Sequence, residues 1–311
     1  MSLKYTMDVL ELLDDPQING EAVIQLFANV QNCEASFETV EGQQGSTDFI
    51  KILIKGSNGK SNGGNAPSLG IVGRLGGLGA RPSRIGFVSD GDGAAAAVAI
   101  ALKLAAMNQK GDVLSGDVYV TTHICPNAPT VPHEPVEFMG SPVDILTMNR
   151  YEVIPEMDAV LSIDTTKGNR VFNHRGFAIS PTVKEGYILK FSADLVRIME
   201  MTTGDAPVTF AVTTQDITPY GNDVFHINSI LQPAVATDAP VVGVAITANS
   251  AVPGSGTGAS HEVDIAEAVR FCIEVAKEFT NQKISFYDAP EFERLEKLYG
   301  SMKHLQTLGN D

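Results

Sequence analysis

The chain has 311 residues and a mass of 33.1 kDa, which is enough to bury a large core in one big domain or two small ones. Its net charge of −15 and its pI of about 4.8 argue against nucleic acids and anionic membrane surfaces as partners, because both would repel it. No apolar run approaches the ~20 residues that span a bilayer.

The first residues lack the basic-then-apolar layout of a signal peptide. The cysteine count is odd, the spacing is wide and no CxxC pair occurs; the three are Cys33, Cys125 and Cys272. This usage is typical of free thiols in a reducing compartment. We therefore expect a cytoplasmic protein.

Apolar spacing predicts two helices at the start of the chain, residues 4–14 and 19–30, and Asn19 is a good cap for the second. Strands are predicted at 35–40, 48–55 and 69–73. The rest of the chain is organised around residues 85–107. This stretch predicts a short strand at 85–88, a polar turn SDGDG, and a helix without Gly or Pro at 94–107.

Strands and helices alternate through most of the remaining chain. Strands are predicted at 116–122, 157–163, 170–179, 182–191, 208–212 and 240–247, and helices at 193–202, 222–231, 262–280 and 290–308. This order predicts one α/β domain, residues 1–311, with a mixed, mainly parallel sheet and helices on both faces. The proline-rich excursion 126–142 and the helix 290–308 are candidate interface arms, and we expect a homo-oligomer.

Polar side chains follow three predicted strands, at Asp90, His123 and Asp164. The carboxyl ends of neighbouring parallel strands meet at one edge of a sheet, so the three could converge there. Three further histidines lie in loops just beyond, at His133, His174 and His261. Such nitrogen and oxygen ligands suit zinc or another divalent metal. Taken singly, each residue also has an ordinary interpretation as a helix cap, a turn residue or a surface histidine.

The order of elements resembles the catalytic domain of co-catalytic zinc aminopeptidases and carboxypeptidases. The turn Asp90–Ala94 resembles their D-x-x-G-G motif, Ile163-Asp164 resembles a later metal-binding Asp, and the loop before residue 262 resembles their His loop. The resemblance implies the zinc aminopeptidase (phosphorylase/hydrolase-like) fold. It is remote, because each matching stretch is short.

The chain departs from the peptidase pattern at the other metal ligands. The H-x-D motif is replaced by Arg74-Leu75-Gly76, and the Glu-Glu pair by His123-Ile124-Cys125. Gly258 stands at the last histidine position, with His261 nearby. A standard two-zinc site therefore does not carry over.

The chain is more closely similar to a bacterial and archaeal family known as a domain of unknown function. The similarity rests on the stretches GFVSDGDG, TTHICPNAPTVPHEP and FMGSPV, which begin at residues 86, 121 and 138. It covers most of the chain and implies no established activity.

Two functions are compatible with these patterns. The first is a metal-dependent hydrolase of a small peptide or amide with a non-standard metal site, in which Glu134 or Glu137 serves as general base. The second is a degenerate, non-hydrolytic homologue that binds a small molecule or a partner. A thiol mechanism through Cys125 is a third route. No nucleotide cofactor is expected, because GGLGAR lacks the G-K-[ST] ending of a phosphate loop.

Overall fold

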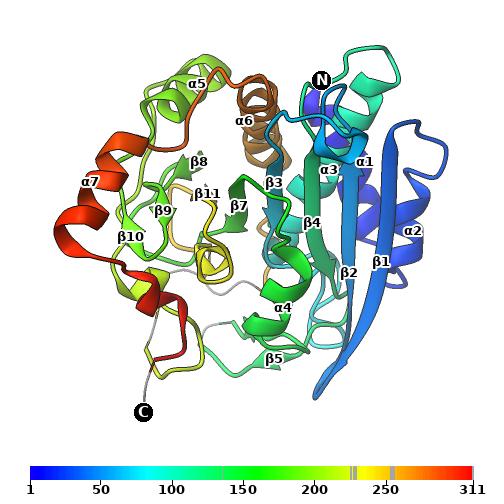
Figure 1. Ribbon diagram of the computed structural model, residues 1–311. Coiled ribbons are helices and arrows are strands. Elements are labelled where there is room, and N and C mark those ends of the chain that lie inside the picture. Colours follow the sequence, from blue (N-terminus) through cyan, green and yellow to red (C-terminus); the bar gives the residue numbers. More distant parts are fainter. Residues whose placement is uncertain (135, 225, 227–229, 253–255, 310–311) are drawn as a thin grey trace.

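The computed structural model describes residues 1–134, 136–224, 226, 230–252 and 256–309 (Figure 1). The described residues form one nine-stranded sheet and a separate two-stranded one. The path of the large sheet runs β1 (Cys33–Gly42), β2 (Gly45–Ile54), β4 (Val118–Ile124), β3 (Leu69–Gly73), β7 (Ala159–Thr165), β11 (Val241–Thr247), β9 (Val183–Lys184) and β10 (Tyr187–Ile188). Off this path, β8 (Gly176–Ile179) also pairs with β11, and β5 (Thr130–Val131) pairs with β6 (Phe138–Met139).

The four central strands β4, β3, β7 and β11 run parallel, whereas the strands on either side join antiparallel. Every residue of β3, β4 and β11 is buried. Strands buried on both faces read as continuous apolar runs, which is why these segments are recognisable in the sequence. The mixed α/β sheet with a parallel centre confirms the predicted fold class.

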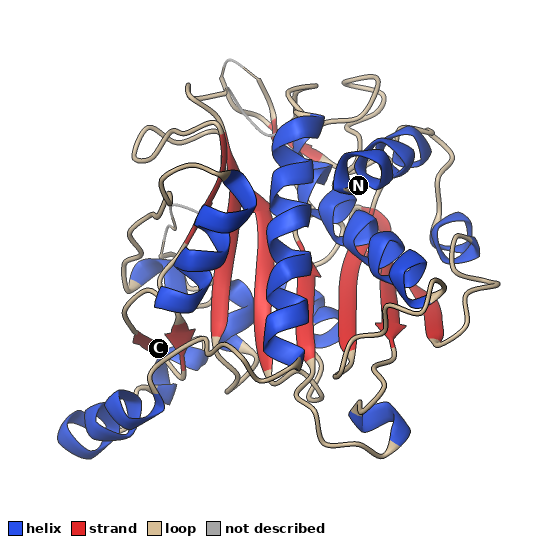
Figure 2. Cartoon of the chain, turned by 90° about the horizontal axis from the view of Figure 1, so that it is seen from above, coloured by secondary structure: helices blue, strands red, loops and turns tan. Residues whose placement is uncertain are grey.

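One face of the sheet is covered by long helices, which Figure 2 shows packed over the strands. The α-helices are α1 (Ser2–Leu13), α2 (Gly20–Gln25), α3 (Asp92–Asn108), α4 (Ile145–Glu152), α5 (Ala193–Thr203), α6 (Glu262–Thr280) and α7 (Ala289–Tyr299). The alanine-rich α3 packs on the central strands, with α6 beside it and α1 against both. Small side chains let α3 come close to the sheet, and most of its length is buried.

The opposite face carries a smaller apolar cluster, and α4 packs there against β4 and β2. Short 3-10 turns also contribute to the fold: η1 (Lys60–Asn62), η2 (Ser89–Gly91), η3 (Gln215–Ile217), η4 (Gln232–Val235) and η5 (Lys303–Gln306). Along each strand, successive side chains alternate between the two faces. Val120 and Ile124 therefore face α3, whereas Tyr119 and His123 face the smaller cluster.

Several predicted elements differ in the structure. The predicted strand 85–88 is irregular and Ile85 is 91% exposed, so Asp90 lies in η2 and not at a strand end. Residues 208–212 form only an isolated bridge, at Thr209. The predicted helix 222–231 lies partly outside the described residues, and the described part of it is not helical. Short apolar runs do not by themselves distinguish strand from buried loop.

The two candidate arms have clear structure. The excursion 126–142 contains β5 and β6. The C-terminal helix ends earlier than predicted, at Tyr299, where Gly300 adopts a φ of 82°. Their role in an interface stays a prediction. Within the described residues, no helix has the length and apolar character needed to cross a membrane.

Candidate functional site

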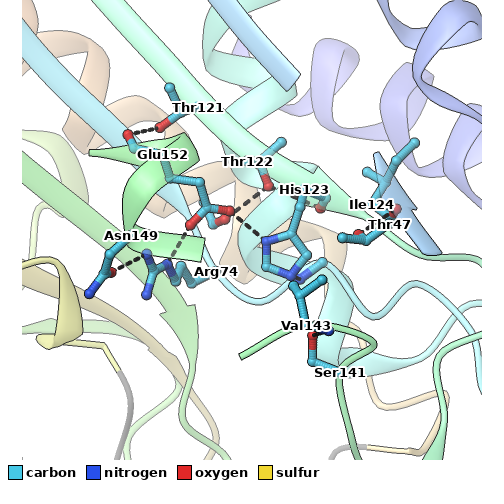
Figure 3. A network of polar contacts seen from close by, with 12 residues as sticks. Thr47, Arg74, Thr121, Thr122, His123, Ile124, Ser141, Val143, Asn149 and Glu152 are labelled. Carbon is cyan, nitrogen blue, oxygen red and sulfur yellow. Dashed lines mark hydrogen bonds and ion pairs between the residues drawn. The ribbon is translucent and has the colours of Figure 1, made fainter. Parts of the chain in front are cut away.

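His123 is the penultimate residue of β4 and lies on the face covered by α4, where its ring is 2% exposed (Figure 3). Its Nδ1 lies 2.5 Å from Oε1 of Glu152, the last residue of α4. Its Nε2 accepts a hydrogen bond of 3.1 Å from the backbone N–H of Gly76. Because an N–H points at Nε2, the proton of the neutral ring sits on Nδ1 and is donated to Glu152.

Glu152 is held from the other side by Arg74, the first residue after β3 (Figure 3). The guanidinium Nε lies 2.6 Å from Glu152 Oε2, and Nη2 donates to Asn149 Oδ1 at 2.6 Å. Arg74 and Glu152 are both fully buried. Burial opposes ionisation of Glu152, but the charge of Arg74 and the hydrogen bonds from His123 and Arg74 more than offset this and lower its pKa. The three side chains form a continuous buried polar network, in which Arg74 Nη1 is left without a hydrogen-bond partner.

The lowered pKa of Glu152 gives a testable pH dependence. A carboxyl group whose pKa is lower in the folded state stabilises the fold above its unfolded pKa and loses that effect as the pH falls. We expect the free energy of unfolding to decrease below about pH 5 and the decrease to be shallower in Glu152→Gln. Urea titrations at pH 7, 5 and 4 measure it. Parallel profiles for the two proteins would contradict the assignment to Glu152.

The two aspartates of the predicted metal set are buried at the same edge of the sheet. Asp90 lies in η2 and is 5% exposed; a side chain added at Gly77 would meet its Oδ2. Asp164 lies in β7 and is 3% exposed. Burial raises the pKa of Tyr220, and the charges of Asp164 and Asp216 raise it further.

The other predicted ligands lie in separate places. His133 is exposed, bonds through Nδ1 to the Val136 carbonyl and packs on Phe138. His174 is also exposed. His261 precedes α6, with Nδ1 3.5 Å from Asp264 Oδ2.

In the described part of the chain, no three His, Cys, Asp or Glu side chains are grouped so that they could hold a metal ion. Both nitrogens of His123 are engaged within the protein, and Arg74 brings a positive charge to the edge where cationic metals were expected. The residues in this arrangement do not fit a metal centre. No reaction step through a metal follows from it.

The three predicted catalytic side chains are not part of the polar network around His123. Burial raises the pKa of the Cys125 thiol to about 11, and its Sγ contacts the Ser46 carbonyl, so the thiol is protonated at neutral pH. Glu137 is half-buried; its own backbone N–H and Arg84 lower its pKa, which makes it a weaker base. Glu134 is exposed on the excursion.

A second buried polar cluster lies on the α3 side of this edge. Asp92, the first residue of α3, accepts from Lys167 Nζ at 2.5 Å through Oδ2 and from the Ser260 hydroxyl through Oδ1. Lys167 also donates to the Ala259 carbonyl at 2.8 Å. Asp92 is fully buried and Lys167 is 3% exposed. Asp92 therefore joins α3 to two segments outside its own helix.

A cavity of about 470 Å³ opens beside this cluster, at the carboxyl end of β11 and the start of α6. Its lining combines polar and apolar side chains and comes from three segments: Arg175; Ala248, Asn249, Ser250 and Val252; and His261, Glu262, Val263 and Asp264. Arg175 Nε lies 3.5 Å from Asp264 Oδ1. We call this cavity the α6 pocket. His261 lines it, the one predicted ligand that does.

Sequence reasoning missed Glu152, Lys167, Arg175 and Ser260. Lys167 had a usable signal, because it closely follows a buried strand that ends in Asp164-Thr165, and such positions lie at the functional edge of an α/β sheet. Glu152 had none, since it ends a helix that the sequence did not predict. Its role appears only when α4 is packed on β4.

Among solved structures, the chain is similar to the bottromycin maturation enzyme BotP in complex with Mn. The two share 13% sequence identity and a TM-score of 0.49, over 89% of this chain and 71% of that one. No curated protein matches the sequence. The family model described as "Protein of unknown function (DUF1177)" matches residues 38–309, which is most of the chain. The chain therefore belongs to the DUF1177 family.

Proposed function

We propose that this protein binds a small zwitterion, of the amino-acid or short-peptide type, in the α6 pocket, and that it does not use two-metal hydrolysis. The observation that carries the proposal is the presence of both charge signs on one cavity wall. Arg175 lies beside Asp264, with Glu262 next to them. A cavity of about 470 Å³ is within the range of small-molecule sites, and it lies where ligands bind in open α/β sheets.

The charges fit the two ends of such a ligand. The Arg175 side chain is 73% exposed and contacts Asp264 through Nε. Its Nη groups would donate to the ligand carboxylate. Glu262 and Asp264 offer carboxylates to a ligand ammonium. The first turn of the 19-residue helix α6 has no side-chain cap from His261. Its backbone N–H groups are a further source of positive potential.

The test uses glycylglycine as the probe. Its binding is measured by saturation-transfer NMR and calorimetry. We expect wild type to bind it and Arg175→Gln to weaken binding roughly tenfold or more, because a charge-assisted hydrogen bond contributes about 1.5–3 kcal/mol. The matched control is Arg84→Gln, which removes an exposed arginine paired with Glu137 outside the pocket. N-acetylglycinamide, which has no charged ends, should not bind. Equal affinity in wild type and Arg175→Gln would refute the site.

The second candidate is a metal-dependent hydrolase of a small peptide or amide, as the peptidase resemblance implies. One observation favours it: a carboxylate bonded to histidine Nδ1, as Glu152 is to His123, is the arrangement that orients metal-bound imidazoles. This function would require His123 Nε2 to leave the Gly76 N–H. In the same experiment Zn or Mn is added, bound metal is measured and glycylglycine cleavage is followed. One equivalent of metal, with turnover lost in Asp90→Ala, would favour the hydrolase over the first proposal.

A further inference from the structure

Lys167 connects the end of β7 to the segment that precedes α6, which lies more than 80 residues later in the sequence. It follows β7 by two residues, and its backbone carbonyl accepts a 2.8 Å hydrogen bond from Val252 N–H. Its Nζ donates to the Ala259 carbonyl, also at 2.8 Å. One residue thus holds two points, seven residues apart, of the segment that leads into α6.

The ammonium of Lys167 is in turn fixed by α3. Asp92 binds it through one carboxylate oxygen and takes the Ser260 hydroxyl on the other. A buried ion pair is a costly way to gain stability, and such pairs are best explained where they specify one arrangement of the chain. Here the arrangement that the pair specifies is that of residues 259 and 260.

This arrangement sets the wall of the α6 pocket. Ala259 and Ser260 immediately precede His261, whose carbonyl accepts from Ile265 N–H in the first turn of α6. Asp264 then contacts His261 through Oδ2 and Arg175 through Oδ1. A continuous set of contacts therefore runs from the buried ion pair to the charged groups in the pocket.

We propose that Lys167 is a positioning residue for the α6 pocket: through Asp92, Ala259 and Ser260 it holds His261 and the start of α6 where a zwitterionic ligand meets Arg175 and Asp264. This inference rests on the proposed ligand site. It assigns to Lys167 no contact with the ligand.

The test compares wild type with Lys167→Met and with the double variant Lys167→Met/Asp92→Leu. The double variant removes both charges, so that no buried carboxylate is left unpaired if the single variant fails to fold. For a folded variant we expect glycylglycine to bind at least tenfold more weakly. We also expect the Ile265 amide to exchange with solvent at least tenfold faster, with the amides of β4 unchanged.

The matched control is Lys184→Met. Lys184 has the same kind of contacts, a carboxylate of Glu185 at 2.5 Å and the Asp238 carbonyl at 2.7 Å, but it lies outside the pocket lining. Lys184→Met should leave both the glycylglycine affinity and the Ile265 amide exchange unchanged. A folded double variant with wild-type affinity and wild-type Ile265 exchange would overturn the role of Lys167. Failure of the wild type to bind glycylglycine would instead remove the ligand site, and the exchange measurement would still test whether Lys167 positions α6.

Discussion

Replacing Arg74 with methionine lowers the free energy of unfolding by about 3–5 kcal/mol, because it leaves the Glu152 carboxylate buried without its main counter-charge. The Asn149 amide oxygen also loses the donor that Nη2 provides. Urea denaturation at pH 7, monitored by circular dichroism, measures the change. The variant should unfold at a lower urea concentration with a similar slope.

The charge argument predicts a partial rescue. In Arg74→Met/Glu152→Gln no buried carboxylate remains, and the glutamine carbonyl can still accept from His123 Nδ1–H. The double variant should therefore recover roughly 1–3 kcal/mol of the loss, which a double-mutant cycle isolates.

The matched control for Arg74→Met is Lys4→Met. Lys4 pairs with Asp8 on the surface of α1, with both side chains at least half exposed, and such pairs contribute about 0–1 kcal/mol. Similar losses for Arg74→Met and Lys4→Met would contradict the claim that burial makes the Arg74 pair important.

The sequence predicts the strands and helices better than it predicts the side-chain contacts between them. The strand 69–73 and the helix 262–280 have the predicted bounds, because a buried parallel strand and a long amphipathic helix have strong periodic patterns. The run at 85–88 was misread as a strand. It is only four residues long and precedes a helix, and Ile85 faces solvent.

The candidate site was only partly predictable, for the same physical reason. The sequence indicates His123, Asp90 and Asp164 from the ends of predicted strands, and all three are buried, although the strand predicted before Asp90 is absent. The partner that each of these side chains binds depends on long-range packing. Glu152 lies 29 residues after His123 in the sequence, and the two side chains meet only because α4 packs on β4. No local pattern encodes that contact.

Gly93, at the end of the turn 89–93, is required for close packing and not for backbone conformation. Gly93 does not have a positive φ, so the turn does not require glycine there for its conformation. Instead, a methyl group at Gly93 would overlap the Arg74 carbonyl oxygen and lie 2.7 Å from the Ile163 carbonyl oxygen. Both are backbone atoms at the ends of central strands, and they cannot rotate away as a side chain can. Glycine therefore allows α3 to begin directly against the sheet.

Gly93→Ala should therefore lower the free energy of unfolding by about 3 kcal/mol or more, at the upper end of the range for overpacked positions. Because α3 must move, the bonds of Asp92 to Lys167 and Ser260 should be disturbed as well. Urea denaturation measures the first effect, and the exchange rate of the Ile265 amide reports the second.

Gly168→Ala is the matched control for Gly93→Ala. A methyl group at Gly168 would have one neighbour, the Val252 carbonyl oxygen at 3.5 Å, which is ordinary van der Waals contact. Its effect should stay within about 0.5 kcal/mol, as at most sites without a specific contact. If Gly93→Ala were as mild as Gly168→Ala, α3 would not be in close contact with the strand ends. The placement of Asp92 beside Lys167, on which the pocket argument depends, would then have to be abandoned.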